Sequence, residues 1–144
     1  MSFVDCRNIE KETETNGNYR KVVKTVEGMQ LVLMSLNVGE TIPCETHSGE
    51  GAQFIRVESG TGKLTANDSQ KCRLSSGTSL LIPNGIHHCI ENTSKTKPLK
   101  LYSVYTPPQH ASNRQDARQP KKEPESRKKT PVKAIRKTKT RGKK

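Results

Sequence analysis

Short runs of strand-forming residues recur from Tyr19 to Pro108, and turn residues separate them at intervals of roughly 8–12 positions. No stretch before residue 110 keeps the apolar period of an amphipathic helix, although the sequence permits a short helix within 5–15. This pattern favours an antiparallel sandwich or barrel. The expected strands are 21–25, 29–36, 41–47, 52–58, 62–66, 79–82, 87–91 and 99–105.

Two of these strands alternate clearly enough to assign their faces, because successive strand side chains point to opposite sides of a sheet. In 52–58, Gln53 shares the inward face with Ile55 and Val57, whereas Arg56 and Glu58 are expected to face water. An inward amide needs a polar partner. In 99–105 the expected inward side chains are Leu99, Leu101, Ser103 and Tyr105.

Charge divides the chain into two unequal parts. Residues 1–108 carry 12 Lys and Arg against 11 Asp and Glu, whereas residues 109–144 carry 14 against 3. The second part contains only two aliphatic residues larger than Ala, Val132 and Ile135, and cannot bury enough apolar surface to fold alone. We therefore expect a near-neutral β-barrel domain over 1–108 and a disordered basic tail over 109–144, not one uniformly basic domain.

The tail has more positive charge than solubility requires, which predicts binding to the phosphates of DNA or RNA. No aromatic residue follows Tyr105, so base stacking is not expected to add sequence preference. A solvated extension or a targeting signal is the alternative. The predicted phosphate-binding residues are Lys121, Lys122, Arg127, Lys128, Lys129, Lys133, Arg136, Lys137, Lys139, Arg141, Lys143 and Lys144.

Other features narrow the expected compartment. The longest apolar runs, 31–34 and 80–82, are far shorter than the ~20 residues of a membrane span. The N-terminus lacks the apolar region of a secretory signal, so we expect an intracellular protein that is cytoplasmic, nuclear, or associated with a nucleoid or virion. Reduced thiols are then expected, with an oxidised pair as the alternative. The cysteines are Cys6, Cys44, Cys72 and Cys89.

Four polar side chains have the spacing of a metal site. Glu45 and His47 lie two residues apart on an expected strand and share one face, and Gln53 follows across a Gly-containing turn. The turn at 83–85 places His88 at the start of a new strand. Two imidazoles, a carboxylate and an amide that converge inside a small barrel are suitable ligands for a divalent metal ion.

Neighbouring residues of the same types receive no role in this site. Strand alternation turns His87 to the face opposite His88, so it is expected at the surface. Cys44 and Cys89 flank predicted ligands by one position and are expected to pack away from the metal. His110, at the start of the tail, carries no functional pattern.

The chain resembles the cupin family, specifically its small single-domain bacterial-type members, over about residues 6–110. The second motif of the family runs Gly, five residues, Pro-x-Gly, two residues, His, three residues, Asn. This sequence matches every position of that motif. The matching residues are Gly77, Pro83, Gly85, His88 and Asn92.

The first cupin motif runs Gly, five residues, His-x-His, three or four residues, Glu, six residues, Gly, and it is degenerate here. Gly39, His47 and Gly60 keep their places, whereas Glu45 replaces the first histidine and Gln53 replaces the glutamate. One extra residue separates His47 from Gln53, in a Gly-rich turn that can absorb it. The set Glu, His, Gln, His also occurs among small cupins.

The resemblance implies a double-stranded β-helix, or jelly-roll barrel, and a homodimer. It also implies that Glu45, His47, Gln53 and His88 hold a divalent iron, manganese, zinc or nickel ion. Tyr105 is the inward phenol available as a catalytic acid.

Three functions remain open from the sequence. The first is a metal-dependent oxygenase or isomerase that acts on a small molecule. The second is a non-catalytic cupin in a chromatin, nucleoid or virion assembly, attached to nucleic acid through its tail. The third is a sensor of a metal or small ligand. The sequence does not decide whether the protein is an enzyme.

Overall fold

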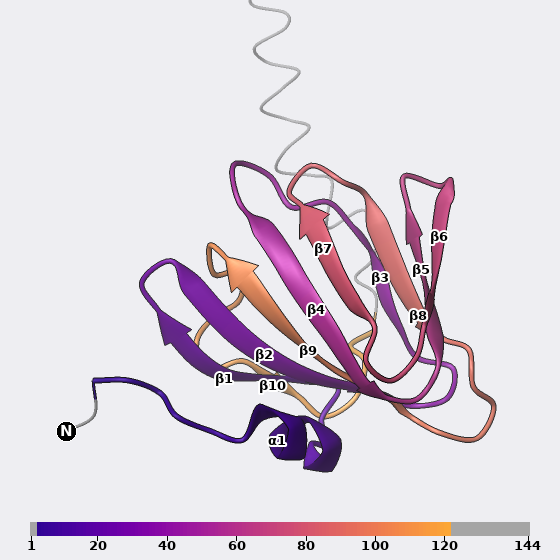
Figure 1. Ribbon diagram of the computed structural model, residues 1–144, viewed down its shortest axis with the longest axis horizontal. Helices are drawn as coiled ribbons and strands as arrows, with labels where there is room; N and C mark the ends of the chain where they lie inside the picture. The colour runs from indigo at the N-terminus through magenta and orange to yellow at the C-terminus, as the bar shows by residue number, and fades with distance from the viewer. Residues whose placement is uncertain (1–2, 122–144) are drawn as a thin grey trace, which may run out of the picture.

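The computed structural model describes residues 3–121 and is built mainly from antiparallel β-strands (Figure 1). One short helix precedes the strands and packs against β2, β4 and β9. The elements are α1 (Ile9–Thr15), β1 (Arg20–Val26), β2 (Met29–Leu36), β3 (Thr41–Glu45), β4 (Ala52–Ser59), β5 (Gly62–Ala66), β6 (Gln70–Leu74), β7 (Ser79–Pro83), β8 (His88–Asn92), β9 (Leu99–Thr106) and β10 (Gln115–Asp116). No helix of this described part is long and apolar enough to cross a membrane.

The strands form two sheets that face each other around one core (Figure 1). The larger sheet has the order β10-β1-β2-β9-β4-β7, and the smaller has the order β3-β8-β5-β6. Every strand pair is antiparallel, and several neighbours in space are far apart in the chain, as in the pairing of β2 with β9. The predicted all-β jelly-roll barrel is thus confirmed.

The inward faces predicted for two strands are correct. Gln53, Ile55 and Val57 of β4 are buried, and so are the four alternate residues of β9 from Leu99 to Tyr105. The apolar members of these sets pack with those of the other strands into one cluster. The smaller sheet contributes Ile42, Leu64, Leu74 and Ile90 to that cluster.

Glu58 departs from the predicted alternation, because it is buried instead of facing water. The register of β4 against β9 shifts between Val57 and Ser59, so two consecutive residues of β4 lose contact with solvent. Helix α1 packs against β4 on this side of the sheet. Burial raises the pKa of Glu58, whereas the charge of Arg56, whose Nε lies 3.4 Å from Glu58 Oε2, opposes that rise.

Two strands are present that the sequence pattern does not predict. β6 is rich in polar and charged residues, and among its side chains only Leu74 is fully buried. A strand at the edge of a sheet needs few apolar side chains, because much of its surface faces solvent. The second strand, β10, lies in the predicted tail.

The sequence-based boundary at residue 108 differs from the structure, in which residues 109–121 pack against the barrel. β10 pairs with β1, so that Arg20 lies opposite Asp116, and their side chains form a 2.9 Å ion pair. Gln30 Oε1 accepts hydrogen bonds from the backbone N–H groups of Gln109 and His110, at 3.1 and 3.0 Å. Polar contacts, not apolar burial, hold this segment, which explains why its composition suggested disorder. Residues 122–144 lie outside the described residues.

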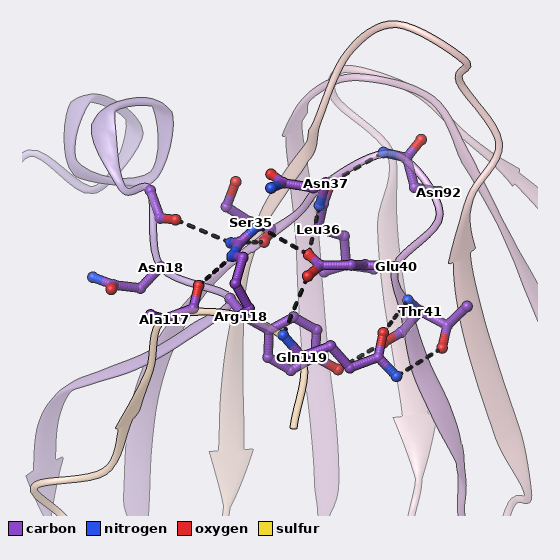
Figure 2. Close-up of polar contacts among 12 residues, drawn as sticks. Asn18, Ser35, Leu36, Asn37, Glu40, Thr41, Asn92, Ala117, Arg118 and Gln119 are labelled. Carbon is purple, nitrogen blue, oxygen red and sulfur yellow. Dashed lines mark hydrogen bonds and ion pairs between the residues drawn. The ribbon is translucent and has the colours of Figure 1, made fainter. Parts of the chain in front are cut away.

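Figure 2 shows how the end of this segment is attached. Arg118 donates hydrogen bonds to the Glu40 carboxylate and to the carbonyl of Ser35, at 3.2 and 3.3 Å. Gln119 donates from its backbone N–H to Glu40 and accepts a 2.8 Å hydrogen bond from the backbone N–H of Thr41, at the start of β3. The segment therefore bridges the beginning of the smaller sheet and the edge of the larger one.

Candidate metal centre

Three predicted ligands come together on the inner face of the barrel. Glu45 ends β3, His47 follows in the next loop, and His88 begins β8. The Glu45 Oε2 atom lies 3.4 Å from His47 Nε2 and 3.6 Å from His88 Nε2. The three ligand atoms all lie within 4.8 Å of one another. Glu45 pairs directly with His88 across β3 and β8, so the sheet register itself sets their distance.

Three of the atoms predicted to bind the metal lack hydrogen-bond partners. His47 Nε2, His88 Nε2 and Gln53 Oε1 are buried and have no hydrogen-bond partner within residues 3–121. His88 Nδ1 lies 2.9 Å from the carbonyl oxygen of Ile86, so Nδ1 carries the proton and Nε2 of the neutral ring presents a lone pair. Gln53 Nε2 donates to Ser103 Oγ at 3.2 Å, which fixes the amide while its carbonyl oxygen stays free.

These groups fit a divalent metal ion. Each buried polar atom without a partner costs about 1–3 kcal/mol, so three of them in one core suggest a ligand that supplies the missing contacts. Two imidazole nitrogens, a carboxylate and an amide oxygen suit iron, manganese, zinc or nickel. The hydrogen bond from His88 Nδ1 to Ile86 is the kind of supporting contact that orients a metal-binding imidazole.

The charges of the site are coupled. Burial raises the pKa of Glu45, but the nearby His88 ring and the charges of His47, His88 and Arg20 outweigh burial and lower it overall. Burial lowers the pKa of His88, but its contacts with Glu45 and with the Ile86 carbonyl outweigh burial and raise it overall. A proton and a metal ion therefore compete for the same pair of groups.

The loop after β3 is tied to the turn after β7. The side-chain amide of Asn84 donates to the carbonyls of Ser48 and Glu50, at 3.1 and 3.3 Å. The backbone N–H of Gly85 donates to the carbonyl of His47 at 2.7 Å. Gly85 has φ +95, a left-handed conformation that disfavours side chains, which explains the glycine in this turn. These bonds hold His47 near His88.

The outer face of the same strand pair carries a disulfide between Cys44 and Cys89. The expectation of a reduced thiol is therefore wrong for these two residues, whereas Cys6 and Cys72 are free. The pairing of Glu45 with His88 places positions 44 and 89 opposite each other, a relation that only the register reveals. His87 also lies on this face, where its Nδ1 is 3.1 Å from Thr46 Oγ1.

Tyr105 lies inside the barrel, as expected, and burial raises its pKa well above the usual range. Its ring centroid is 5.6 Å from that of His47 and 5.3 Å from that of His110. His110 received no role from the sequence, yet the segment after β9 brings it to this end of the barrel.

Asn92, the last residue of the second motif, has a structural role. Its side-chain amide donates hydrogen bonds to the carbonyls of Leu36 and Lys97.

Comparisons with known proteins agree with this arrangement. A family model described as the cupin domain matches residues 32–105. The chain is 43% identical over 115 residues to the uncharacterized protein L612 of Acanthamoeba polyphaga mimivirus, which covers 78% of this chain and 71% of that protein. It is 36% identical over 108 residues to the uncharacterized protein YrkC of Bacillus subtilis, where 72% of this chain matches 57% of the relative.

Among solved structures, the crystal structure of BH2720 from Bacillus halodurans is similar with a TM-score of 0.75 and 36% sequence identity. The match covers 79% of this chain and 89% of that one. This likeness extends over most of both molecules, which agrees with a single folded unit.

Proposed function

The chain belongs to the cupin family, and on this premise we propose that it binds one divalent metal ion through Glu45, His47, Gln53 and His88. The observation that carries the proposal is the convergence of the Glu45 carboxylate with two buried nitrogens, His47 Nε2 and His88 Nε2, which have no hydrogen-bond partner among the described residues. Gln53 Oε1 is a further buried acceptor without a partner there. Iron, manganese, zinc and nickel all suit this donor set.

Glu45, His47, Gln53 and His88 would hold the metal, which would supply Lewis-acid or redox chemistry to a bound small molecule. The proposed activity is that of an oxygenase or isomerase. Tyr105 is the candidate acid, because its phenol is buried next to His47 and keeps its proton at neutral pH. Tyr105→Phe would retain the ring and the bound metal but lower turnover if the phenol donates a proton.

Metal analysis of the purified full-length protein tests the proposal. We expect about one equivalent of a single divalent metal per chain, and its loss on treatment with a chelator. Metal-free protein should recover the same stoichiometry when titrated with iron, manganese, zinc or nickel. Protein that takes up no metal from any of these titrations would refute the proposal and leave a non-catalytic cupin as the alternative.

We also propose a second function, binding of nucleic-acid phosphates by the basic residues at the C-terminal end of the sequence. Arg114 and Arg118 are already engaged by Asp116 and Glu40. Residues 122–144 contain 11 Lys and Arg against 2 Glu, and all the predicted contacts except Lys121 lie in this range. This charge supports binding without sequence preference.

A salt titration of the full chain and of residues 1–121 on unrelated DNA duplexes and on single-stranded RNA tests this second function. If six to ten side chains contact phosphates, duplex affinity should fall by about 10³–10⁵ between 50 and 200 mM salt. Residues 1–121 should bind weakly or not at all. Equal binding by the two chains would move the contact to the barrel, whereas no binding by either at low salt would refute the proposal.

The homodimer implied by the family resemblance is also a proposal, which light scattering of the purified protein tests. A sensor role would combine the two proposals above. It predicts that metal loading changes the affinity of the full chain for DNA, and equal affinities with and without metal would contradict it.

A further inference from the structure

Three residues of metal-binding types gather on the outer face of the β3 and β8 pair. Cys44 and Cys89 lie there beside His87, and one ligand atom of each residue lies within 4.8 Å of the other two. The inner-face centre uses none of these residues. Cysteine sulfur and histidine nitrogen are the commonest zinc ligands in structural sites of proteins. After reduction of the disulfide, this face would therefore present two sulfur ligands and one nitrogen ligand.

Strand geometry brings these side chains to one face. Glu45 pairs with His88, so positions 44 and 89 lie opposite each other, and the Cα atoms of the two cysteines are 4.1 Å apart. His87 lies two residues before Cys89 and shares its side of the sheet. Because Zn–S bonds are about 2.3 Å long, two sulfur ligands of a tetrahedral zinc ion lie about 3.7 Å apart. Rotation about the Cα–Cβ bonds of Cys44 and Cys89 gives that separation once the S–S bond is broken.

His87 is held beside the sulfur atoms by its neighbours. Its backbone N–H donates to Asn67 Oδ1 at 3.1 Å, and its carbonyl accepts a 2.7 Å hydrogen bond from the backbone N–H of Asn67. Its ring Nδ1 lies 3.1 Å from Thr46 Oγ1. A hydroxyl group on one ring nitrogen is the kind of supporting contact that orients a metal-binding imidazole.

The disulfide is accessible to reagents. Cys44 is exposed and Cys89 is half-buried, and both residues line a cavity of about 360 Å³. A reductant, an oxidant or a metal ion therefore reaches this pair without entering the barrel core. Among the described residues, the free cysteines Cys6 and Cys72 belong to no comparable group of ligands.

We propose that Cys44, His87 and Cys89 form a second, redox-controlled site for zinc or another thiophilic divalent metal ion. The thiolate is the form of cysteine that binds metal, and a disulfide holds no thiolate. The crosslink and the metal therefore exclude each other, so the site is available only after reduction. It shares no ligand with the inner-face centre and does not depend on it.

The redox step moves two electrons between the sulfur atoms and a peroxide or a thiol reductant. In the metal-bound form, one thiolate attacks a peroxide oxygen, which gives a sulfenic acid and releases hydroxide. The second thiolate attacks that sulfur, forms the S–S bond and displaces a second hydroxide, and the metal ion leaves with its sulfur ligands lost. In the reverse direction, a dithiol returns two electrons by thiol–disulfide exchange and leaves as its own disulfide.

Cobalt titration of the full-length protein tests the proposal, because a cobalt–thiolate bond gives an intense charge-transfer band in the near ultraviolet. The inner-face ligands include no sulfur, so the band reports the outer face whether or not the inner centre holds metal. The protein is measured with its disulfide intact and after reduction by a phosphine, which becomes the phosphine oxide and is removed before titration. His87→Ala, which keeps both bonded cysteines, is the test variant. The double variant Cys6→Ser and Cys72→Ser is the matched control, because it removes only the free thiols.

We expect the reduced wild type and the reduced control to show the band and to bind one more equivalent of cobalt or zinc than their oxidised forms. His87→Ala should bind that equivalent at least about tenfold more weakly. One equivalent of hydrogen peroxide should abolish the band and release the extra metal. Absence of the band from the reduced wild type, its loss in the control, or a titration of His87→Ala identical to that of the wild type would overturn the proposal.

Discussion

The two faces of the β3 and β8 strand pair differ although their residues are immediate neighbours in sequence. On the inner face, Glu45 and His88 present polar atoms toward a buried centre. On the outer face, Cys44 and Cys89 are joined covalently. Strand alternation thus separates the candidate metal site from the disulfide, with a spacing of one residue.

The difference between the faces predicts that substitutions of two adjacent histidines change the metal content differently. His88→Ala, like His47→Ala, should abolish stoichiometric metal, because each removes an imidazole from the inner face. His87→Ala should leave the metal content near that of the wild type, since its ring lies on the outer face. Elemental analysis of purified, refolded and metal-loaded variants measures this. Equal metal loss in all three variants would mean that the assigned register of β8 is wrong by one residue.

Removal of the disulfide should lower the stability of the protein more than it changes metal binding. It closes a loop with a sequence separation of 45 residues, which corresponds to about 4 kcal/mol of unfolding free energy in the chain-entropy model. Replacing both Cys44 and Cys89 by Ser should therefore lower denaturant stability by about 2–4 kcal/mol and retain one metal equivalent. Treating the wild type with a dithiol should have the same effect. A double variant as stable as the oxidised wild type would contradict the structural role of the crosslink.

The coupled groups of the inner face should also make the free energy of unfolding of the metal-free protein depend on pH. The pKa of His88 is raised, so its stabilising contribution is complete below the unfolded value near 6.5 and is lost as pH rises through the folded pKa. The pKa of Glu45 is lowered, so its contribution is present above about 4.5 and is lost as pH falls through the folded pKa. The pair therefore contributes most between these limits.

Denaturant melts of metal-free wild type and Glu45→Gln at several pH values test this expectation. The difference in unfolding free energy between the two proteins should be largest at about pH 5–6 and should decrease on either side. His87→Ala serves as the outer-face control and should follow the wild type. A difference that does not vary with pH would show that the carboxylate and imidazole are not coupled.

The smallest effect is expected from Thr46→Val. This change removes the contact between Thr46 Oγ1 and His87 Nδ1 on the outer face, at a surface where water can replace it. The free energy of unfolding should fall by less than about 1 kcal/mol, and the metal content should stay constant. Loss of metal in this variant would show that the two faces are energetically linked through the loop after β3.

Much of the barrel could be predicted from the sequence, because most of its strands are recognisable from the alternation of their side chains and from the turn residues between them. The inward placement of Gln53 and Tyr105 was predicted from that alternation alone. The burial of Glu58 was not predicted, because the register shift against β9 and the packing of α1 depend on distant segments. The polar strand β6 gave no apolar pattern to detect.

The candidate site shows the same division. Glu45, His47 and His88 could be proposed together because motif spacing and the i, i+2 rule place them on one face. The positions of His110 and Arg20 could not be predicted. They depend on the pairing of β10 with β1 and on the hydrogen bonds of Gln30 with the chain after β9. Neither contact leaves a local periodic pattern in the chain.

The sequence by itself determined most of the strands, the inward residues expected on β4 and β9, and the residue types of the candidate site, because these depend on side-chain alternation and on the chemistry of each residue. Only the tertiary structure decided that Cys44 is bonded to Cys89, that Glu58 is buried, and that residues 109–121 pack against the barrel. These features arise from contacts between segments far apart in the chain. Their energies come from register, burial and polar pairing that exist only after the sheets have assembled.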